Sequence, residues 1–369
     1  YRWITAHQNP RTGLVLSFEG DNDIRDWAFI YDQSLAGQVY MLGNDFGRVR
    51  KMLDFFKNKA QRSQGWFFNA YYFDDGSPAE CIVHTGPNIW IGILAMQYTK
   101  KSGDNSYLVL AQDIADKIIA FQKQDSDGGL RGGPQVSWYS TEHNLDAYAF
   151  LNMLYSLTNN KDYSQSRDKI MSWIEKHTYD KADVPVKRGK GDSTIATDTY
   201  AWSIAAIGPE KLLELSMSPD KIINFAQDNM AVEVLYKRPD GIQVKIKGFD
   251  FAPQRHLARG QVVSAEWTAQ MVISYQIMAD FWEHKQNQSK AKSYQTLADD
   301  YLDSLGSMII TSPSASGQGD FCLPYATEEF VDTGHGWSTP KGSSTGSLSA
   351  SAYAFFAYRR YNPLAFKEE

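Results

Sequence analysis

The sequence contains few cysteines and no long apolar run. Only Cys81 and Cys322 occur among 369 residues, which is too few for a disulfide framework, and neither belongs to a paired metal-ligand motif. No segment approaches the roughly 20 consecutive apolar residues of a membrane-spanning helix, so we predict no membrane span. A G-x-x-x-x-G-K-[ST] phosphate loop is also missing, and the Gly-rich stretches are therefore interpreted as turns.

Positive charge is scarce as well. The chain carries 37 Lys and Arg against 43 Asp and Glu, a net charge of −6. Nucleic acids are bound by clustered cations, which excludes them as the main partner, and the basic run at 187–190 is interpreted as a solvated loop. Asp125 and Asp127 lack the spaced ligands of an EF-hand, so we predict neither a metal nor a cofactor.

Aromatic residues, in contrast, make up 14% of the chain, with 10 Trp and 21 Tyr. Most of these rings are expected in the core, because they are the largest side chains available for burial. Several Trp residues nevertheless stand beside Gly, Pro and polar residues, where a packed interior is less expected. The chain begins with Tyr1 rather than Met, which is compatible with a removed export signal and favours an extracytoplasmic location.

Six segments share one design: a lead-in rich in Gly, Ser, Thr and Pro, an apolar Ala-rich helix, and a more polar helix. The apolar helices are predicted to begin near Asp32, Asn88, Glu142, Asp198, Glu266 and Thr345. A helix that is apolar nearly all round is buried on all sides, whereas the second helices, such as 107–122, carry one apolar stripe. The pattern predicts an all-α toroid, with an inner ring of buried helices wrapped by an outer ring.

Three insertions interrupt the repeats. Residues 64–84 and 234–251 alternate and contain turn signals, so they predict short β-hairpins. Residues 311–344 are rich in Ser, Gly and Pro and predict a long loop that forms a wall or lid of a cleft. No composition shift marks a linker, and we predict a single domain over residues 1–369.

In such a toroid every inner helix begins at the same end, so residues far apart in sequence converge on one cavity. Paired carboxylates with exposed aromatic faces suit a saccharide site, since the acids transfer protons and stabilise an oxocarbenium-like transition state. Glu142 and Glu266 are the first candidate pair, with Asp198 and Asp32 as competitors. Asp146, one turn after Glu142, is either a further acid or a hydrogen-bond partner that orients its neighbours. A lone first-turn acid can also simply cap its helix.

The motifs IYDQ at 30–33, TGPNIW at 85–90, WYSTEHNLDAY at 138–148, ATDTYAW at 196–202 and SAEWTAQ at 264–270 resemble inner-helix starts of the six-hairpin (α/α)6 carbohydrate-active enzymes. That superfamily contains glycoside hydrolases, sugar epimerases and polysaccharide lyases, and the resemblance covers nearly the whole chain. It implies an oligo- or polysaccharide substrate. Many toroid hydrolases invert configuration, so it also implies an inverting reaction, although the sequence leaves retention open.

Further residues at or near these starts are candidates for substrate binding. They are His143, Asn144, Asn88, Tyr139, Arg131, Trp90, Trp138, Trp202, Trp267 and Trp337. The aromatic rings would stack on sugars, while the polar groups would read hydroxyls.

Three alternatives to a hydrolase remain open. A sugar 2-epimerase or isomerase needs paired bases, and none of the possible partners of His143, which are His84, His256 and His335, is expected at an inner start. A polysaccharide lyase would use Tyr139 or Tyr200 as base and Arg131 to neutralise a uronate. A non-catalytic toroid would bind glycans without changing them. The oligomeric state is also left open.

Overall fold

The protein is described here as a computed structural model that covers residues 1–180, 183–312, 320–341 and 345–366. Most of the chain is helical and the strands are short. The inner helices begin within a few residues of the predicted starts. They are α2 (Ile30–Leu42), α4 (Thr85–Ser102), α6 (Thr141–Thr158), α8 (Thr197–Trp202, continued by a π-helix over Ser203–Ile207), α11 (Ala265–His284) and α13 (Leu348–Tyr358).

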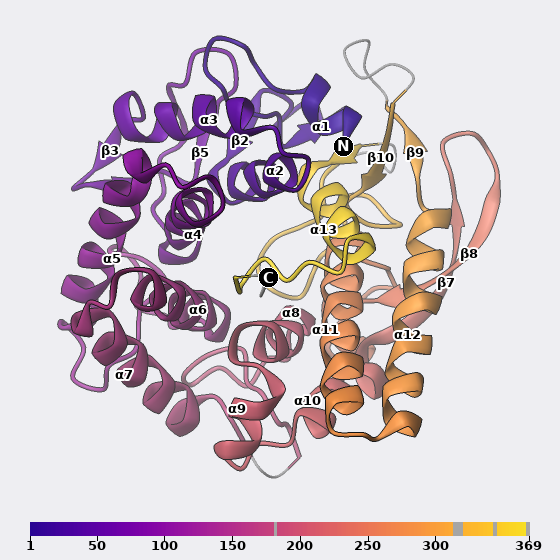
Figure 1. Cartoon of the computed structure of the whole chain (residues 1–369). Coiled ribbons are helices and arrows are strands. Elements are labelled where there is room, and N and C mark those ends of the chain that lie inside the picture. The colour runs from indigo at the N-terminus through magenta and orange to yellow at the C-terminus, as the bar shows by residue number, and fades with distance from the viewer. Residues whose placement is uncertain (181–182, 313–319, 342–344, 367–369) are drawn as a thin grey trace.

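These helices form a closed ring (Figure 1). α2 packs against α4, α4 against α6, α6 against α8, α8 against α11, and α11 against α13, which packs against α2 in turn. A helix with a neighbour on each flank has little surface left for water, which is why α4 is buried over nearly all of its length from Thr85 to Thr99.

A ring of six main-chain hydrogen bonds ties the helix starts together. The first N–H of each inner helix donates to a carbonyl in the segment that leads into the next inner helix. The pairs are Ile30 to Asn69 (2.9 Å), Thr85 to Gly132 (2.8 Å), Thr141 to Arg188 (2.7 Å), Thr197 to Phe251 (3.1 Å), Ala265 to Tyr325 (3.0 Å) and Leu348 to Ser17 (2.9 Å). We call the six acceptors the junction residues. Since the sixth bond closes on the segment before α2, all inner helices begin at one end of the ring.

A second sixfold pattern fixes the lead-in segments. The side chain of the fourth residue in each inner helix bonds the backbone of a buried apolar residue that stands two positions before a junction residue. The pairs are Gln33 with Val15, Asn88 with Phe67, Asn144 with Leu130, Tyr200 with Val186, Thr268 with Phe249 and Ser351 with Leu323. Buried backbone groups outside helices need such partners, so this position is occupied by a polar side chain in a mostly apolar helix.

Outer helices follow five of the inner ones within the described ranges. They are α3 (Phe46–Asn58), α5 (Leu108–Gln122, after the 3₁₀ turn η1 at Asn105–Tyr107), α7 (Lys161–His177), the pair α9 (Pro209–Glu214) and α10 (Pro219–Met230), and α12 (Gln288–Ser307). α13 has no such partner there, and the short α1 (Arg2–Ala6) lies against β10 instead. Five helical hairpins and one single inner helix thus stand where the sequence predicts six hairpins.

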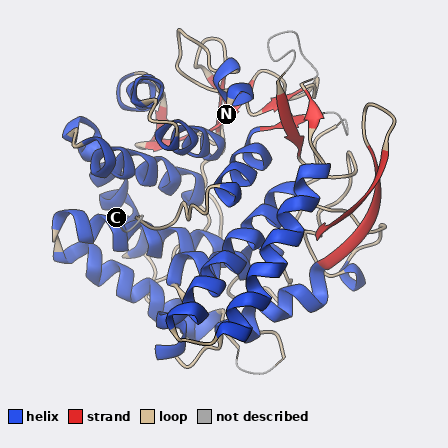
Figure 2. Cartoon of the chain, turned by 45° about the vertical axis from the view of Figure 1, so that its right-hand side comes forward, coloured by secondary structure: helices blue, strands red, loops and turns tan. Residues whose placement is uncertain are grey.

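The strands are few and short beside the helices (Figure 2), and they lie in the segments that connect the helices. They are β1 (Phe18–Glu19), β2 (Trp27–Phe29), β3 (Arg62–Ser63), β4 (Trp66–Phe67), β5 (Ala70–Tyr72), β6 (Pro78–Glu80), β7 (Ala231–Lys237), β8 (Gln243–Phe249), β9 (Ile310–Thr311), β10 (Phe321–Pro324) and β11 (Gly346–Ser347). The hairpins predicted at 64–84 and 234–251 are present. The prediction of a plain loop at 311–344 is wrong in part, because β9 and β10 join β11 and β1 in one sheet; residues 313–319 and 342–344 lie outside the described residues.

The main hydrophobic core runs through the ring, from Trp3 near the N-terminus to Leu364 near the C-terminus, and a small second cluster contains Phe251 and Trp267. Within the described ranges, every helix is either too short or too polar to cross a bilayer. Both cysteines are free: Cys81 is exposed and Cys322 is buried.

Candidate active site

Three acids occupy the same place in three consecutive inner helices. The second residues of the helices, in ring order, are Tyr31, Gly86, Glu142, Asp198, Glu266 and Ser349. Glu142, Asp198 and Glu266 are therefore neighbours at the mouth of the ring. Asp32 is a third residue, so its side chain is rotated by about 100° from that register. It is 4% exposed and lies close enough to Glu266 for the two charges to interact.

Glu142 and Asp198 are surrounded by protein and yet partly accessible to water. Burial, followed by the charges of Asp198, Asp146 and Glu266, raises the pKa of Glu142 well above its ordinary value. Burial also raises the pKa of Asp198, to about 7, against the N–H of Thr199 and the charge of Arg188, which lower it. The charge of Asp198 thus favours the protonated form of Glu142.

Glu266 is 5% exposed and is held by donors. Its Oε1 accepts from the Tyr31 hydroxyl at 2.8 Å and from the Gln270 amide at 3.1 Å. Burial raises the pKa of Glu266 to about 7, while hydrogen bonds from Ser349 and Tyr31 lower it. The group thus gains or loses its proton close to neutral pH.

Asp146 and Asp32 stand behind these acids. Burial raises the pKa of each to about 8, so both are mainly protonated at neutral pH. Among the described residues, Asp32 Oδ2, Asp146 Oδ2 and Asp198 Oδ1 are buried without a hydrogen-bond partner. Ser17 lies near Asp32 and Trp90 near Asp146, and each lowers the pKa of the carboxyl beside it.

Four aromatic rings close the site from below. Tyr31 packs on Trp90 (5.2 Å between ring centroids), Trp90 on Trp202 (6.1 Å) and Trp202 on Tyr353 (5.7 Å). The circle is completed by a hydrogen bond of 3.2 Å between the hydroxyls of Tyr31 and Tyr353. The Trp202 indole donates to Asp146 Oδ1 at 2.7 Å. We call these four residues the aromatic floor.

The aromatic floor corrects two predictions. Trp90 is 1% and Trp202 2% exposed. Neither therefore presents the open face for a sugar that the sequence predicts. Each is the sixth residue of its helix, one turn deeper than the acids, where the neighbouring inner helices cover it. Trp267 was predicted to be a third open face, and at 6% exposure it is buried too.

Trp138 and Trp337 do present open faces, with 45% and 40% exposure. Trp138 covers the junction residue Gly132, where an added Cβ would lie 2.0 Å from the ring. Trp337 packs edge-on against the junction residues Phe251 and Tyr325. These are the two predicted stacking residues whose placement suits that role.

Two histidines lie beside Trp138. His84 caps α4, 6.2 Å from His143 between ring centroids, so the expectation that no second histidine stands at an inner start is wrong. His143 Nδ1 is 3.0 Å from Thr85 Oγ1. Burial, and then His84, lower the pKa of His143 to about 3, which keeps the ring neutral. Its ring fills the space that the missing side chain of Gly86 leaves.

Two asparagines predicted to bind substrate are structural instead. Asn88 bonds both the N–H and the carbonyl of Phe67, and Asn144 does the same with Leu130. Each is also bonded to the backbone at the start of its own helix. With both ends of each amide engaged, neither side chain is free to read a hydroxyl.

Arg131 and Tyr139 are held by another acid, Asp125. Both contact Asp125, Arg131 through an ion pair of 3.1 Å and Tyr139 through a hydrogen bond of 2.5 Å. The Tyr139 ring packs on Trp173, a core residue as expected. Both side chains are thus engaged by Asp125, and their role in substrate binding stays a prediction.

The sequence did not predict that Arg188, Tyr325 and His335 stand at the mouth of the ring. Arg188, interpreted as part of a solvated loop, is the junction residue between α6 and α8 and lowers the pKa of both Glu142 and Asp198. Tyr325, a junction residue from the insertion, interacts with the charges of Glu266, Asp32, Asp198 and Glu142, and burial together with these charges raises its pKa well above the ordinary value. The regular spacing of the junction residues behind apolar positions was the signal that could have located the first two.

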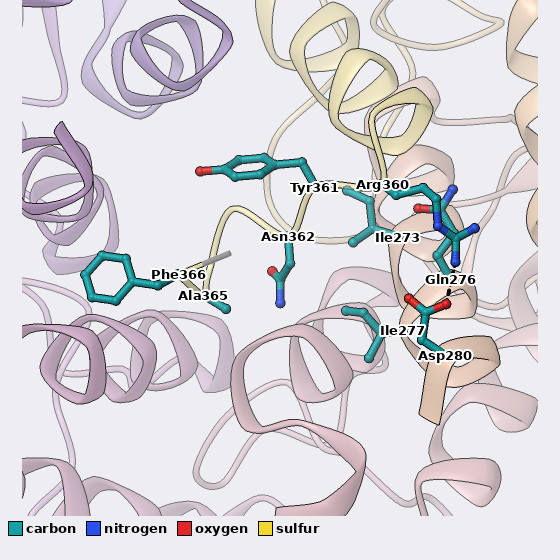
Figure 3. Close-up of a pocket in the computed structure, with 9 residues that line it drawn as sticks. All are labelled: Ile273, Gln276, Ile277, Asp280, Arg360, Tyr361, Asn362, Ala365 and Phe366. Carbon is teal, nitrogen blue, oxygen red and sulfur yellow. Dashed lines mark hydrogen bonds and ion pairs between the residues drawn. The ribbon is translucent and has the colours of Figure 1, made fainter. Parts of the chain in front are cut away.

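A separate pocket lies away from these acids, toward the C-terminal half of α11. It has a volume of about 170 Å³, and its lining includes Ile273, Gln276 and Asp280 of α11 and Arg360 and Asn362 of the C-terminal segment (Figure 3). None of the acids at the mouth lines it. In the part of the chain that the structure describes, no cluster of His, Cys, Asp and Glu has the arrangement of a metal site.

The fold is similar to that of several solved protein structures. No protein-family model matches the sequence, and no curated protein matches it. The structure is similar to that of a glycosidase variant solved with glucose (TM-score 0.64, 13% identity, 98% of this chain and 95% of the other). It is also similar to an α-amylase from Clostridium perfringens (0.60, 12%, 98% and 95%) and to a family 76 glycoside hydrolase, a mannosidase, from Bacteroides thetaiotaomicron (0.59, 14%, 97% and 96%). The chain thus has the fold of solved glycosidases along nearly its entire length.

Proposed function

We propose that the protein is a glycoside hydrolase, with Glu142 as the general acid and Asp198 as the carboxylate that activates water. One observation carries the assignment: these two strongly interacting acids are partly open to solvent, and their surroundings differ. Three carboxyls raise the pKa of Glu142, whereas the N–H of Thr199 favours the charged form of Asp198; Arg188 lowers the pKa of both acids. Two carboxyls driven toward opposite protonation states are what acid and base catalysis of glycoside cleavage requires.

Glu266 and Asp32, the other predicted catalytic acids, are assigned supporting roles. Glu266 is bound by Tyr31 and Gln270 and is less accessible than Asp198, so we place it as an acceptor for a sugar hydroxyl. It remains the competitor for the role of base, and Glu266→Gln tests it beside Asp198→Asn. Loss of the rising limb of the pH profile in one variant alone identifies the base.

We assign the ring to the (α/α)6 toroid class and residues 1–369 to one domain. The closed circle of hydrogen bonds at the junction residues and the continuous core support both assignments. In this assignment α13 is the inner helix of the sixth repeat.

The substrate that we propose is an oligo- or polysaccharide that lies across the mouth. Trp138 covers the junction between α4 and α6, and Trp337 covers those on either side of α11. In the ring order these places are on opposite sides, with Glu142 and Asp198 on the arc between them and Glu266 at the start of α11, between the two junctions that Trp337 contacts. A chain that stacks on both rings would pass over the acids, so we expect internal cleavage. A polymer of this kind is met outside the cytoplasm, where we place the enzyme.

The test is release of reducing ends from neutral glucans, mannans and xylans by the wild type, Glu142→Gln and Asp198→Asn. Loss of at least about a hundredfold in both variants, with unchanged circular dichroism, would support the proposal. Proton NMR of the first product anomer then separates inversion, which we propose, from retention. Binding of glycans without any cleavage by the wild type would contradict the proposal and leave a glycan-binding protein.

A sugar epimerase is the second candidate, because His84 and His143 lie close together beside Trp138. The low pKa of His143 makes it a weak base, which is why we rank this reaction second. Interconversion of free monosaccharides by the wild type, lost in His143→Asn, would establish it. Release of unsaturated sugars from a polyuronate would instead indicate a lyase.

A further inference from the structure

The backbone of Arg188 is fixed by hydrogen bonds and by close packing. Its backbone N–H donates to Thr194 and its carbonyl accepts from Thr141, the residue before Glu142. The next residue is Gly189, where a Cβ would lie 1.9 Å from the carbonyl oxygen of Tyr139. The loop around Arg188 is therefore fixed against the start of α6.

Two side chains fix the guanidinium itself. Nε donates to Asp192 Oδ2 at 2.8 Å, and Nη1 donates to His335 Nδ1 at 3.0 Å. His335 comes from the segment between β10 and β11, far from Arg188 in the sequence. The insertion thus contributes directly to the position of Arg188.

The contacts of His335 define its protonation. Its Nε2 lies 2.9 Å from the carbonyl oxygen of Phe251, which can only accept, so Nε2 carries the hydrogen. Since an arginine can only donate, Nδ1 must present a lone pair to Arg188. The ring is therefore neutral, and burial is the main cause that lowers the pKa of His335, to about 4.

We propose that Arg188 is a positioning residue that keeps Asp198 charged beside a protonated Glu142, and that His335 is the anchor that holds Arg188 there. The inference rests on the proposed function, because it assigns a purpose to the acid pair. Among the described groups, Arg188 is the cation that acts on both acids. Lys187 and Lys190 of the same loop are paired with Asp180 and Asp127 instead.

The charged and titratable groups around Arg188 decide the sign of the effect. Glu142 on α6, Asp198 on α8 and Asp192 in its own loop are acidic, and His335 is neutral. The charges of Asp146 and Glu266 raise the pKa of Glu142, and the raised pKa of Tyr325 keeps that hydroxyl protonated. Without the positive charge of Arg188, the surrounding carboxylates and burial would raise the pKa of both Glu142 and Asp198. Both acids would then hold their protons to higher pH.

The experiment compares Arg188→Met, His335→Phe and the double variant with the wild type, and uses Lys190→Met as control. His335→Phe keeps a ring beside Trp267 while removing both nitrogens. We expect both limbs of the kcat/KM profile to move up by about one pH unit in Arg188→Met, so activity at pH 6 falls about tenfold. His335→Phe should move them in the same direction. The double variant should equal Arg188→Met, because His335 acts through Arg188.

A readout without turnover separates this inference from the proposed function. Carbon-13 NMR of the aspartate carboxyls, with Asp198→Asn for assignment, gives the titration midpoint of Asp198 in an active or an inactive protein. A higher midpoint in Arg188→Met but not in Lys190→Met supports the inference. An unchanged midpoint, or a double variant whose shift is the sum of the two single shifts, overturns it. A wild type that cleaves no glycan would overturn the proposed function alone.

Discussion

Replacing Glu142 by Gln removes a proton donor while preserving the shape and the charge of the site. Gln is as large as Glu and resembles its protonated form, which is the form that the surrounding carboxyls favour. The surroundings of Asp198 therefore change little. Loss of a general acid typically lowers the rate by about 10²–10⁴-fold, and we expect kcat/KM on a natural glycan to fall within that range. An aryl glycoside whose leaving group needs no proton should lose less than about tenfold.

The pH profile supplies the second half of this prediction. Asp198 must be ionised, and its pKa is raised to about 7, so activity should rise with pH through neutrality. Glu142 must keep its proton, and its raised pKa delays the loss of activity to alkaline pH. Since an amide does not titrate, Glu142→Gln should keep the rising limb and lose the falling one.

The control for this variant is Glu175→Gln, the same substitution at an exposed position of α7. It should leave both limbs and the rate unchanged. The reasoning would be refuted if Glu142→Gln hydrolysed the natural glycan at the wild-type rate, or if it retained the alkaline decline. Either result would place the proton donor on another residue.

Three further predictions concern binding and stability. Trp138→Ala and Trp337→Ala should each raise KM for long oligosaccharides about tenfold, or about 1.4 kcal/mol, and leave the shortest substrate unaffected, as measured on a series of chain lengths. Asn144→Ala should lower the free energy of urea unfolding by about 2–4 kcal/mol, because it leaves a buried N–H and carbonyl without partners, whereas Asn152→Ala, at an exposed position of the same helix, should change little. Asp146→Asn should raise Tm at pH 9 but not at pH 3: the folded-state pKa is raised to about 8, so the burial penalty is absent below the unfolded pKa near 4 and complete only above pH 8. Equal Tm changes at both pH values would contradict that reasoning.

Much of the architecture was predictable from the chain. The apolar inner helices, the amphipathic outer ones and the spacing of the repeats predicted a helical ring, because burial on all sides and burial on one side leave different patterns. Glu142, Asp198 and Glu266 were singled out as first-turn acids, and the structure brings them together as neighbours. Trp138 and Trp337 were correctly expected to have open faces.

The errors within the inner helices have a common cause in the helix period. A shift of one residue rotates a side chain by about 100°, so Asp32 and Asn88, counted among the acids and ligands of the site, point elsewhere than Glu142. Trp90 and Trp202 are one turn too deep and became part of the aromatic floor. Local pattern could not reveal this, since the start of each helix was known only to within a few residues.

By itself, then, the sequence determined which segments are helices, which of them are buried, and which residue types meet at their starts. These follow from hydrophobic periodicity and capping, which act over a few neighbouring residues. Only the tertiary structure decided the rotational register of each helix and the partners of Arg188, which include His335, some 150 residues later in the chain. Those features depend on closure of the ring through its six junction hydrogen bonds, in which the last segment meets the first.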